Sequence, residues 1–308
     1  MNTTMAPDGA LPLSHWGLIR ARGAEAATFL QGQLTNDVMS MDTSSVRLAG
    51  FCSAKGRLQA SFVVWKLAPD DVLLACAASV LPAVLKRLSM FVLRAKCKLT
   101  DASAELPLQG VLGAPAKALA GALPVWSQRP HDGGSLIRLP DVAGVARCVL
   151  ATALPPSGLP VVEHYRWREL EVLSGIPVIE AATVDQFVPQ MLNYEIVGGV
   201  DFKKGCYPGQ EVVARSQYRG TIKRRMFLFG CDAVLVAGQE VFHIADASQP
   251  AGMVVNAAAT AGAGSVALVE VKLAALDGGS LHAGSADGAL LIPRSLPYPL
   301  PLDAIAPA

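Results

Sequence analysis

Asp201 to Arg225 read DFKKGCYPGQEVVARSQYRGTIKRR, and this stretch is chemically more specific than any other part of the sequence. Within it, Cys206 lies between Gly205 and Gly209. Glycine lets the backbone approach a ligand closely, and a thiol in such a turn need not be packed into the core. The pattern therefore indicates a cysteine that is available to react.

The same 25 residues carry a strong positive charge. Seven Lys/Arg residues stand against two acidic ones, a local net charge of +5, whereas the whole chain of 308 residues carries only +1. The basic residues are Lys203, Lys204, Arg215, Arg219, Lys223, Arg224 and Arg225. They form either an ordinary solvated surface or a site for phosphates or a chain of carboxylates, for which Arg offers bidentate geometry. The sequence leaves both interpretations open.

Cys206 also has two interpretations. It is either a nucleophile, redox thiol or cluster-exchange ligand, whose thiolate Lys203 and Lys204 would favour, or a small residue that fits a tight turn. No histidine lies within 30 residues on either side to serve as its base. Glu211 has no paired carboxylate nearby in the sequence, so capping of a following element is its better interpretation.

Length and composition indicate a compact protein of two or three domains, with 52% hydrophobic residues. The near-neutral net charge argues against a protein that binds nucleic acid over its whole surface. Six widely spaced cysteines without a C-x-x-C pair predict neither a structural zinc site nor any other metal site. The sequence shows no signal peptide and no apolar window of about 18 residues, so we expect a cytoplasmic protein without a membrane partner.

Hydrophobic patterns along the chain predict an α+β fold. Ser45 to Cys52 and Arg57 to Leu67 predict a β-hairpin, while Val80 to Arg94 and Glu163 to Ser174 predict helices. Alternation of strands and helices in the first half favours a mostly antiparallel sheet. From Met226 onward, short Val/Leu/Ala runs punctuated by glycine predict a small β-barrel or sandwich.

Two of the four tryptophans lie beside charged or polar residues at the edges of predicted elements. Trp16 follows His15, and Trp167 lies between Arg166 and Arg168. A flat aromatic ligand could stack on either indole ring. Core packing is the competing interpretation, and from the pattern alone it is favoured because Trp is usually largely buried.

Lys204 to Glu211 read KGCYPGQE, which resembles the signature of the YgfZ family, folate-binding relatives of the glycine-cleavage aminomethyltransferase. Other stretches agree with this resemblance across most of the chain. They are FLQGQLTNDV at 29–38 with AKGR at 54–57, FVPQ at 187–190 with the glycines at 198 and 199, and Arg215 with YRG at 218–220.

The resemblance implies an aminomethyltransferase-like, folate-binding α+β fold with three domains in a ring and a C-terminal β-barrel. It implies a first part of the folate-binding domain at 1–68, an α+β domain at 69–153, a second part of the folate-binding domain at 161–225 and a barrel at 226–308. The segment between the second and third parts, ALPPSGLP at 153–160, is the clearest linker in the sequence.

The resemblance also implies functional roles. It makes the protein a tetrahydrofolate-binding factor that assembles, repairs or maintains iron–sulfur enzymes, including those that modify tRNA. Trp16 and Trp167 would then contact folate, and Cys206 would be the functional cysteine. The basic run would bind the glutamate tail of folate or tRNA. The residues of the signature turn around Cys206 are Lys204, Gly205, Tyr207, Gly209, Gln210 and Glu211.

Two departures from the aminomethyltransferase pattern make glycine cleavage doubtful. Those enzymes carry an acidic pair, including the catalytic aspartate, where this chain has Ala60-Ser61, and a folate-contacting glutamate where this chain has Leu173. Losing both would remove transition-state and binding energy. Whether any reaction is catalysed thus stays open, and the alternatives are a one-carbon transferase with a donor other than glycine, and a tRNA-binding module.

Overall fold

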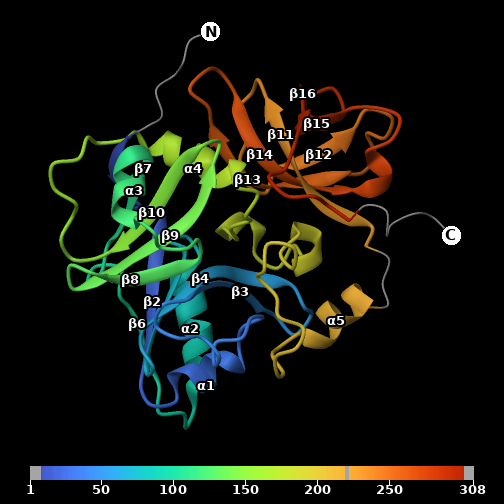
Figure 1. Cartoon of the computed structure of the whole chain (residues 1–308). Helices are drawn as coiled ribbons and strands as arrows, with labels where there is room; N and C mark the ends of the chain where they lie inside the picture. The colour runs from blue at the N-terminus through green and yellow to red at the C-terminus, as the bar shows by residue number, and fades with distance from the viewer. Residues whose placement is uncertain (1–7, 219–221, 302–308) are drawn as a thin grey trace.

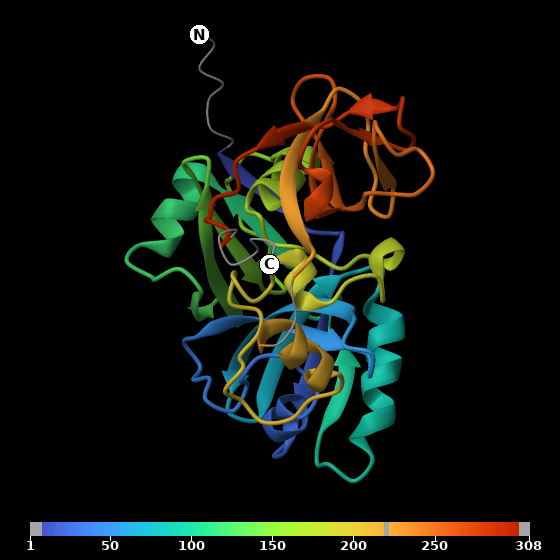
Figure 2. The same ribbon diagram turned by 90° about the vertical axis from the view of Figure 1, so that its right-hand side faces the viewer.

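The computed structural model describes residues 8–218 and 222–301. These residues form two five-stranded sheets and one seven-stranded sheet, and every strand pair in them is antiparallel. Figures 1 and 2 show the three sheets arranged around the segment 176–200, which lies at the centre of the molecule. The expected α+β class with mostly antiparallel pairing is confirmed.

The first sheet has the strand order β3-β4-β5-β2-β6. Its strands are β2 (Trp16–Arg22), β3 (Val46–Cys52), β4 (Leu58–Ala68), β5 (Asp71–Ala77) and β6 (Lys98–Asp101). Helices α1 (Ala26–Gln31) and α2 (Leu81–Val92) cover one face. Because the other face packs on the second sheet, strands such as β4 and β5 are nearly continuous apolar runs.

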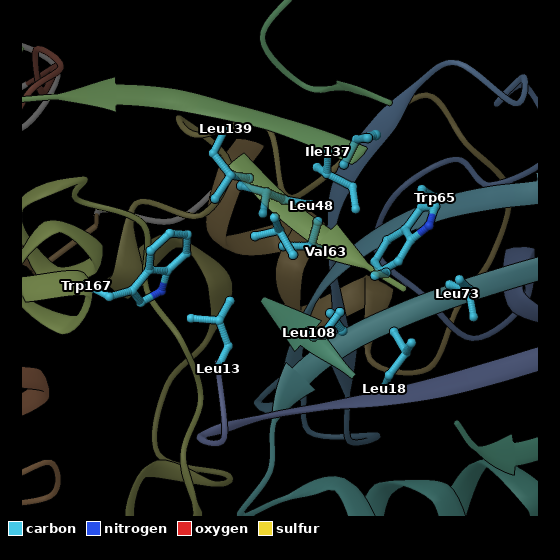
Figure 3. Packing of buried hydrophobic residues seen from close by; sticks show 14 of the residues in the cluster. Leu13, Leu18, Leu48, Val63, Trp65, Leu73, Leu108, Ile137, Leu139 and Trp167 are labelled. Carbon is cyan, nitrogen blue, oxygen red and sulfur yellow. The ribbon is translucent and has the colours of Figure 1, made fainter. Parts of the chain in front are cut away.

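The second sheet has the order β1-β7-β10-β9-β8. Its strands are β1 (Gly9–Pro12), β7 (Leu108–Leu112), β8 (Ser127–His131), β9 (Gly134–Val142) and β10 (Val145–Ala151), and helix α3 (Gly113–Ala120) covers its outer face. A single core joins it to the first sheet, with Trp65 towards one end and Trp167 towards the other (Figure 3). The Trp65 indole N–H donates to Ser135 Oγ across this core at 3.2 Å.

The third sheet forms a nearly closed barrel with the order β16-β15-β12-β13-β14-β11-β17. Its strands are β11 (Arg224–Cys231), β12 (Glu240–His243), β13 (Gly252–Ala259), β14 (Ser265–Lys272), β15 (Leu281–Ala283), β16 (Ala289–Leu290) and β17 (Ile292–Arg294), with the short helix η3 (Leu273–Ala275). This confirms the C-terminal barrel predicted from Met226 onward.

The barrel is joined to the two facing sheets by α4 (His164–Leu173), η1 (Ala181–Thr183), η2 (Pro189–Leu192) and α5 (Gln210–Tyr218). A third core runs from β11 and β14 to Val172 of α4 and to Phe187 and Leu192. The chain between α4 and β11 therefore contacts all three sheets and holds the candidate site.

The boundary expected after residue 68 does not follow the edge of a sheet. It falls between β4 and β5, which pair as a hairpin in one sheet that also contains β6. Conversely, β1 pairs with β7 and belongs to the second sheet. The turn that joins β4 to β5, Pro69-Asp70, is short, as is usual between neighbouring strands that pair, and its composition is not that of a linker.

Candidate functional site

A small cavity lies where α4 meets the edges of the two facing sheets, and it has a volume of about 50 Å³. Its lining is mostly apolar, and the polar and aromatic side chains in it are those of Trp16, Ser61, Phe62, Trp126, Arg147, Glu171, Ser174 and Tyr194. A few buried polar groups in an apolar wall are typical of a small-molecule site.

Glu171 is the most heavily hydrogen-bonded side chain in this cavity. Its Oε1 accepts the indole N–H groups of Trp16 and Trp167, each at 2.7 Å. Its Oε2 lies 3.0 Å from His15 Nε2 and 3.3 Å from a guanidinium nitrogen of Arg168. Burial alone would raise the pKa of Glu171, but the contacts with His15, Arg168 and Trp167 outweigh it and hold this pKa below its ordinary value. Glu171 is thus a buried, ionised carboxylate.

The two predicted folate-contacting tryptophans are brought together by this carboxylate. Trp16 is half-buried and lines the cavity, whereas Trp167 is 0% exposed and packs in the core between the sheets (Figure 3). In this conformation Trp167 cannot stack on a ligand, and its influence on the cavity passes through Glu171. Sequence reasoning missed Glu171, although its position four residues after Trp167 places both on one face of α4.

Two further residues of the cavity were not foreseen. Tyr194 is fully buried, and its hydroxyl has no hydrogen-bond partner among the described residues. Trp126 lines the cavity with a backbone φ of 58°, a region that bulky residues avoid. A buried unpaired hydroxyl and local strain both mark places where a structure gives up stability for function.

An open groove of about 660 Å³ adjoins the cavity, and Leu48 and Trp126 line both. The groove has both apolar and polar walls, and its charged residues are Arg47, Asp201 and the exposed Lys203. Tyr218 and Phe202 add aromatic surface, with their rings edge to face at 5.8 Å. The groove therefore extends from the cavity to Asp201, Phe202 and Lys203, which directly precede the signature turn.

The signature turn presents Cys206 to solvent as an exposed free thiol. Its neighbour Lys204 is buried, and the ammonium donates to the backbone carbonyls of Gln31 and Leu34 after α1. Lys204 also lies 5.0 Å from the ring centre of the buried Tyr207, and burial lowers the pKa of Lys204 to about 8. Lys204 therefore anchors the turn.

Gly209 fixes the other side of the turn. Its φ is +78°, and a Cβ there would lie 2.4 Å from the carbonyl oxygen of Ser53 and 2.6 Å from Gly56 Cα, in the turn between β3 and β4. Gly205 has open space around it. The turn is followed at once by α5, which contains Gln210 and carries Glu211 in its first turn, as expected for an acidic residue near a helix N-terminus.

The basic run does not form one anion-binding surface. Arg225 is 3% exposed and pairs with Glu195 at 2.5 Å, and Arg224 pairs with the buried Glu270. The expectation of an anion site is therefore wrong for these two, because they point to opposite faces of β11 and each pairs with a carboxylate of the protein. Lys203, Arg215 and Lys223 are exposed, and Arg219 lies outside the described residues.

The departures at Ala60-Ser61 and Leu173 can now be placed. Ala60 is fully buried, and Ser61 Oγ in the cavity wall accepts the backbone N–H of Ile179 at 2.9 Å. Leu173 packs against the cores, so it brings no polar group to the cavity. The carboxylate that the cavity does contain, Glu171, comes from the preceding part of the same helix.

Among residues 8–218 and 222–301, no cluster of three or more His, Cys, Asp or Glu side chains could hold a metal ion. Within the same ranges, no helix is long and apolar enough to span a membrane.

A family model and one solved structure agree with this architecture. Residues 4–131 match the family model of the GCVT N-terminal domain. The glycine cleavage system aminomethyltransferase T from Bartonella henselae is similar with a TM-score of 0.74 and 18% identity, over 96% of this chain and 87% of that chain. A heterotetrameric sarcosine oxidase from Corynebacterium sp. U-96 aligns with 46% of this chain and 73% of its own at 17% identity and a TM-score of 0.31. The chain thus has the aminomethyltransferase-like fold over nearly its whole length.

Proposed function

We propose that this protein is a tetrahydrofolate-binding accessory factor of the YgfZ type, which uses Cys206 to assemble, repair or maintain iron–sulfur enzymes, including enzymes that modify tRNA. The observation that carries the proposal is the exposed thiol of KGCYPGQE on an aminomethyltransferase-like fold. A cytoplasmic location fits this role and is part of the proposal.

The chemistry of the cavity fits a reduced pterin. Such a ring presents amino and ring N–H donors along one edge, which a carboxylate such as Glu171 accepts. Trp16 and Trp126 supply aromatic walls, and the unpaired hydroxyl of Tyr194 supplies one more polar contact. When bound, tetrahydrofolate would supply a carrier for one-carbon units.

The volume sets a condition on binding. About 50 Å³ holds water molecules but not a bicyclic ring, so a wall residue must turn. Trp16 is the candidate, because it is half-buried while its hydrogen-bond partner Glu171 stays fixed by Trp167, His15 and Arg168. The adjoining groove then has room for the rest of the ligand.

The groove would hold the polyglutamate tail. Arg47 and Lys203 both line it, and the ammonium of Lys203 is exposed. Carboxylates along a flexible tail pair favourably with such cations, although each exposed pair contributes only about 0–1 kcal/mol. The tail would lead from the cavity to the base of the signature turn.

Cys206 would act on partners at the protein surface. An exposed thiolate can ligate iron or exchange with a disulfide, and both need access to a second macromolecule. Lys204 and Gly209 fix the two sides of the turn, so the thiol is held at a defined place. Partners are therefore iron–sulfur enzymes or their assembly factors.

A one-carbon transferase with a donor other than glycine is the second candidate, and Glu171 is the observation that favours it. It is a carboxylate in the cavity wall of a chain whose Ala60-Ser61 positions offer none. Incubating the protein with tetrahydrofolate and candidate amine or thiol donors tests this function. Formation of methylene-tetrahydrofolate would support it, and folate binding without turnover would leave the accessory factor. A tRNA-binding module is less favoured, because Arg224 and Arg225 are paired internally.

The test of the proposed function is complementation. In cells lacking the wild-type protein, the Cys206→Ala variant is expected to leave iron–sulfur enzyme activity unrestored, while Cys97→Ala, which removes a half-buried thiol, restores it. Both purified variants should still bind 5-formyltetrahydrofolate. Full rescue by Cys206→Ala would overturn the role of the thiol, and absence of folate binding by the wild-type chain would overturn the role of the cavity.

A further inference from the structure

Two histidines lie beside Glu171, and the function proposed above uses only His15, as one of the groups that hold this carboxylate in place. His15 precedes β2, and His164 is the first residue of α4. His15 Nε2 lies 3.0 Å from Glu171 Oε2, and His164 Nε2 lies 2.8 Å from His15 Nδ1, with the two rings edge to face. Since His164 is exposed and Glu171 lines the cavity, these side chains form a continuous hydrogen-bonded chain from solvent to the cavity wall.

Only one arrangement of protons satisfies both contacts when the two rings are neutral. His15 donates its Nε2–H to the ionised Glu171, and its Nδ1 accepts the Nε2–H of His164. Nδ1 of His164 then keeps a free lone pair. If this atom takes a proton from solvent, the Nε2 proton of His164 can pass to Nδ1 of His15. The result is an imidazolium at His15 and a neutral His164, with one proton gained in all.

The charged groups around the pair allow such a transfer. Arg168 of α4 is the nearest cation, but it divides its charge between Glu171 and Glu180, which it contacts at 3.3 and 2.7 Å. Arg147 of β10 acts on Glu171 from farther away, and the end of β5 offers only the backbone N–H of Ala78 to the carbonyl of His15. Burial lowers the pKa of His164, and the charge of Arg168 lowers it further. His164 is thus suited to pass a proton inward rather than to hold it.

We propose that His15 and His164 form a proton relay that couples occupation of the cavity to the uptake of a proton at His15. A ligand removes water from around Glu171, and weaker screening strengthens the attraction between this carboxylate and an adjacent imidazolium. The inference rests on the proposed folate function and adds a pH dependence to it.

The sign follows from proton linkage. The occupied state holds more protons than the free state, so affinity rises as the pH falls through the imidazole range, from about 8 to about 6. Uptake of a full proton corresponds to a change of at most about tenfold in Kd per pH unit. A purely structural role for the two histidines would weaken binding without producing this slope.

The experiment is calorimetric titration of the full chain with 5-formyltetrahydrofolate at pH 6, 7 and 8, in phosphate and in Tris, whose different heats of ionisation reveal proton uptake. The variants are His15→Gln, which keeps an N–H donor but cannot titrate, and His164→Asn at an exposed position. His131→Gln serves as the matched control, because His131 lies in β8 and pairs with Asp132.

The wild-type chain and the control are expected to take up protons on binding and to bind more tightly at pH 6 than at pH 8. His15→Gln should lose both effects, and His164→Asn should reduce them. Binding without proton uptake by the wild-type chain would overturn the relay, and unchanged uptake in both variants would overturn its assignment to these histidines. No binding at any pH would overturn the proposed function itself. Since His164 is exposed, the His164→Asn variant keeps the test decisive even where His15→Gln fails to fold.

Discussion

Glu171 and Cys206 occupy opposite kinds of surroundings. Glu171 is 8% exposed, and it is held by donors from the start of β2 and from its own helix. Cys206 is exposed, and only its flanks, Lys204 and Gly209, are fixed by the rest of the protein. The surroundings of Glu171 therefore suit a group that holds a bound ligand in place, whereas those of Cys206 suit a thiol that is presented to a partner outside the protein.

The same contrast divides the basic run. Lys204, Arg224 and Arg225 are engaged with carbonyls or carboxylates, while Lys203, Arg215 and Lys223 are exposed. The high local charge in the sequence therefore combines residues of two kinds. Some anchor this part of the chain to the rest of the protein, and the others present their charge to solvent. Substitutions of the engaged residues should therefore lower stability much more than substitutions of the exposed ones.

Arg225→Ala should have the largest effect on stability. It leaves the carboxylate of Glu195 buried without its partner, and breaking a buried pair in this way typically costs about 3–5 kcal/mol. Urea unfolding measures the change. The control is Lys223→Ala at an exposed position two residues earlier, which should stay within about 0.5 kcal/mol. Equal effects of the two substitutions would mean that Arg225 is not an anchor.

Gly209→Ala should cost about 2–4 kcal/mol, because a Cβ at φ +78° is strained and would also lie 2.4 Å from the Ser53 carbonyl. Gly205→Ala is the matched control inside the same turn, with open space around its Cβ, and should be nearly neutral. Thermal unfolding of both variants measures these changes in stability. A stable Gly209→Ala variant would show that the turn is not pinned against the β3–β4 turn.

Lys204→Met should cost about 1–3 kcal/mol, since the carbonyls of Gln31 and Leu34 lose their donor. Lys203→Met is the exposed control and should be neutral.

The contribution of Lys204 to stability should also depend on pH, and the sign of this dependence follows from its pKa. Burial lowers the pKa of Lys204 to about 8 in the folded state, below that of an unfolded lysine, so the unfolded state binds more protons between these values. Stability of the wild-type chain should therefore rise from pH 8 to 10 relative to Lys204→Met.

Cys206→Ala should leave stability unchanged within about 0.5 kcal/mol, because the thiol is exposed. Its effect should appear only in reactivity. Burial raises the pKa of Cys52 and Cys76 to about 12 and that of Cys148 to about 11, so these thiols resist modification. A disulfide reagent should modify one thiol per native chain rapidly, and this phase should vanish in Cys206→Ala. A fast phase that persists would assign the reactive thiol elsewhere.

The contribution of Glu171 to the stability of the fold should depend on pH in the acid range. The pKa of Glu171 is below the ordinary glutamate value near 4.3 in the folded state, so its contribution to stability is present above that value and is lost as the pH falls through the folded pKa. Stability of the wild-type chain should therefore fall more steeply below pH 5 than that of Glu171→Gln. Parallel curves from pH 6 to 3 would contradict an ionised Glu171.

Much of the fold could be predicted from local patterns. The hairpin of β3 and β4, the helices α2 and α4 and the C-terminal barrel all follow from periodicity and turn residues. Helix α5 was not foreseen, because Gln210 to Tyr218 lies in a stretch interpreted through its charge and its thiol rather than its period. The domain boundary at residue 68 stays a prediction, and it does not follow the sheets because the pairing of β4 with β5 is not marked by composition.

The site could be predicted only where a motif carried it. Cys206 stands in a recognisable signature, and its exposure agrees with a functional thiol. Glu171 was not predicted as a site residue, because its partners Trp16 and His15 are 155 and 156 residues away in the sequence. The pairing of Arg225 with Glu195, 30 residues away, was hidden for the same reason, since charge runs give no sign of which members find buried partners.

We propose that the cavity binds the ligand and that the signature turn around Cys206 carries the chemistry. The most direct measurement is the affinity for 5-formyltetrahydrofolate, followed by quenching of tryptophan fluorescence, in the wild-type chain, Glu171→Gln and Cys206→Ala. We expect Cys206→Ala to bind like the wild-type chain and Glu171→Gln to bind at least about tenfold more weakly, a loss of about 1.4 kcal/mol or more. Wild-type affinity in Glu171→Gln, or lost binding in Cys206→Ala, would contradict the division.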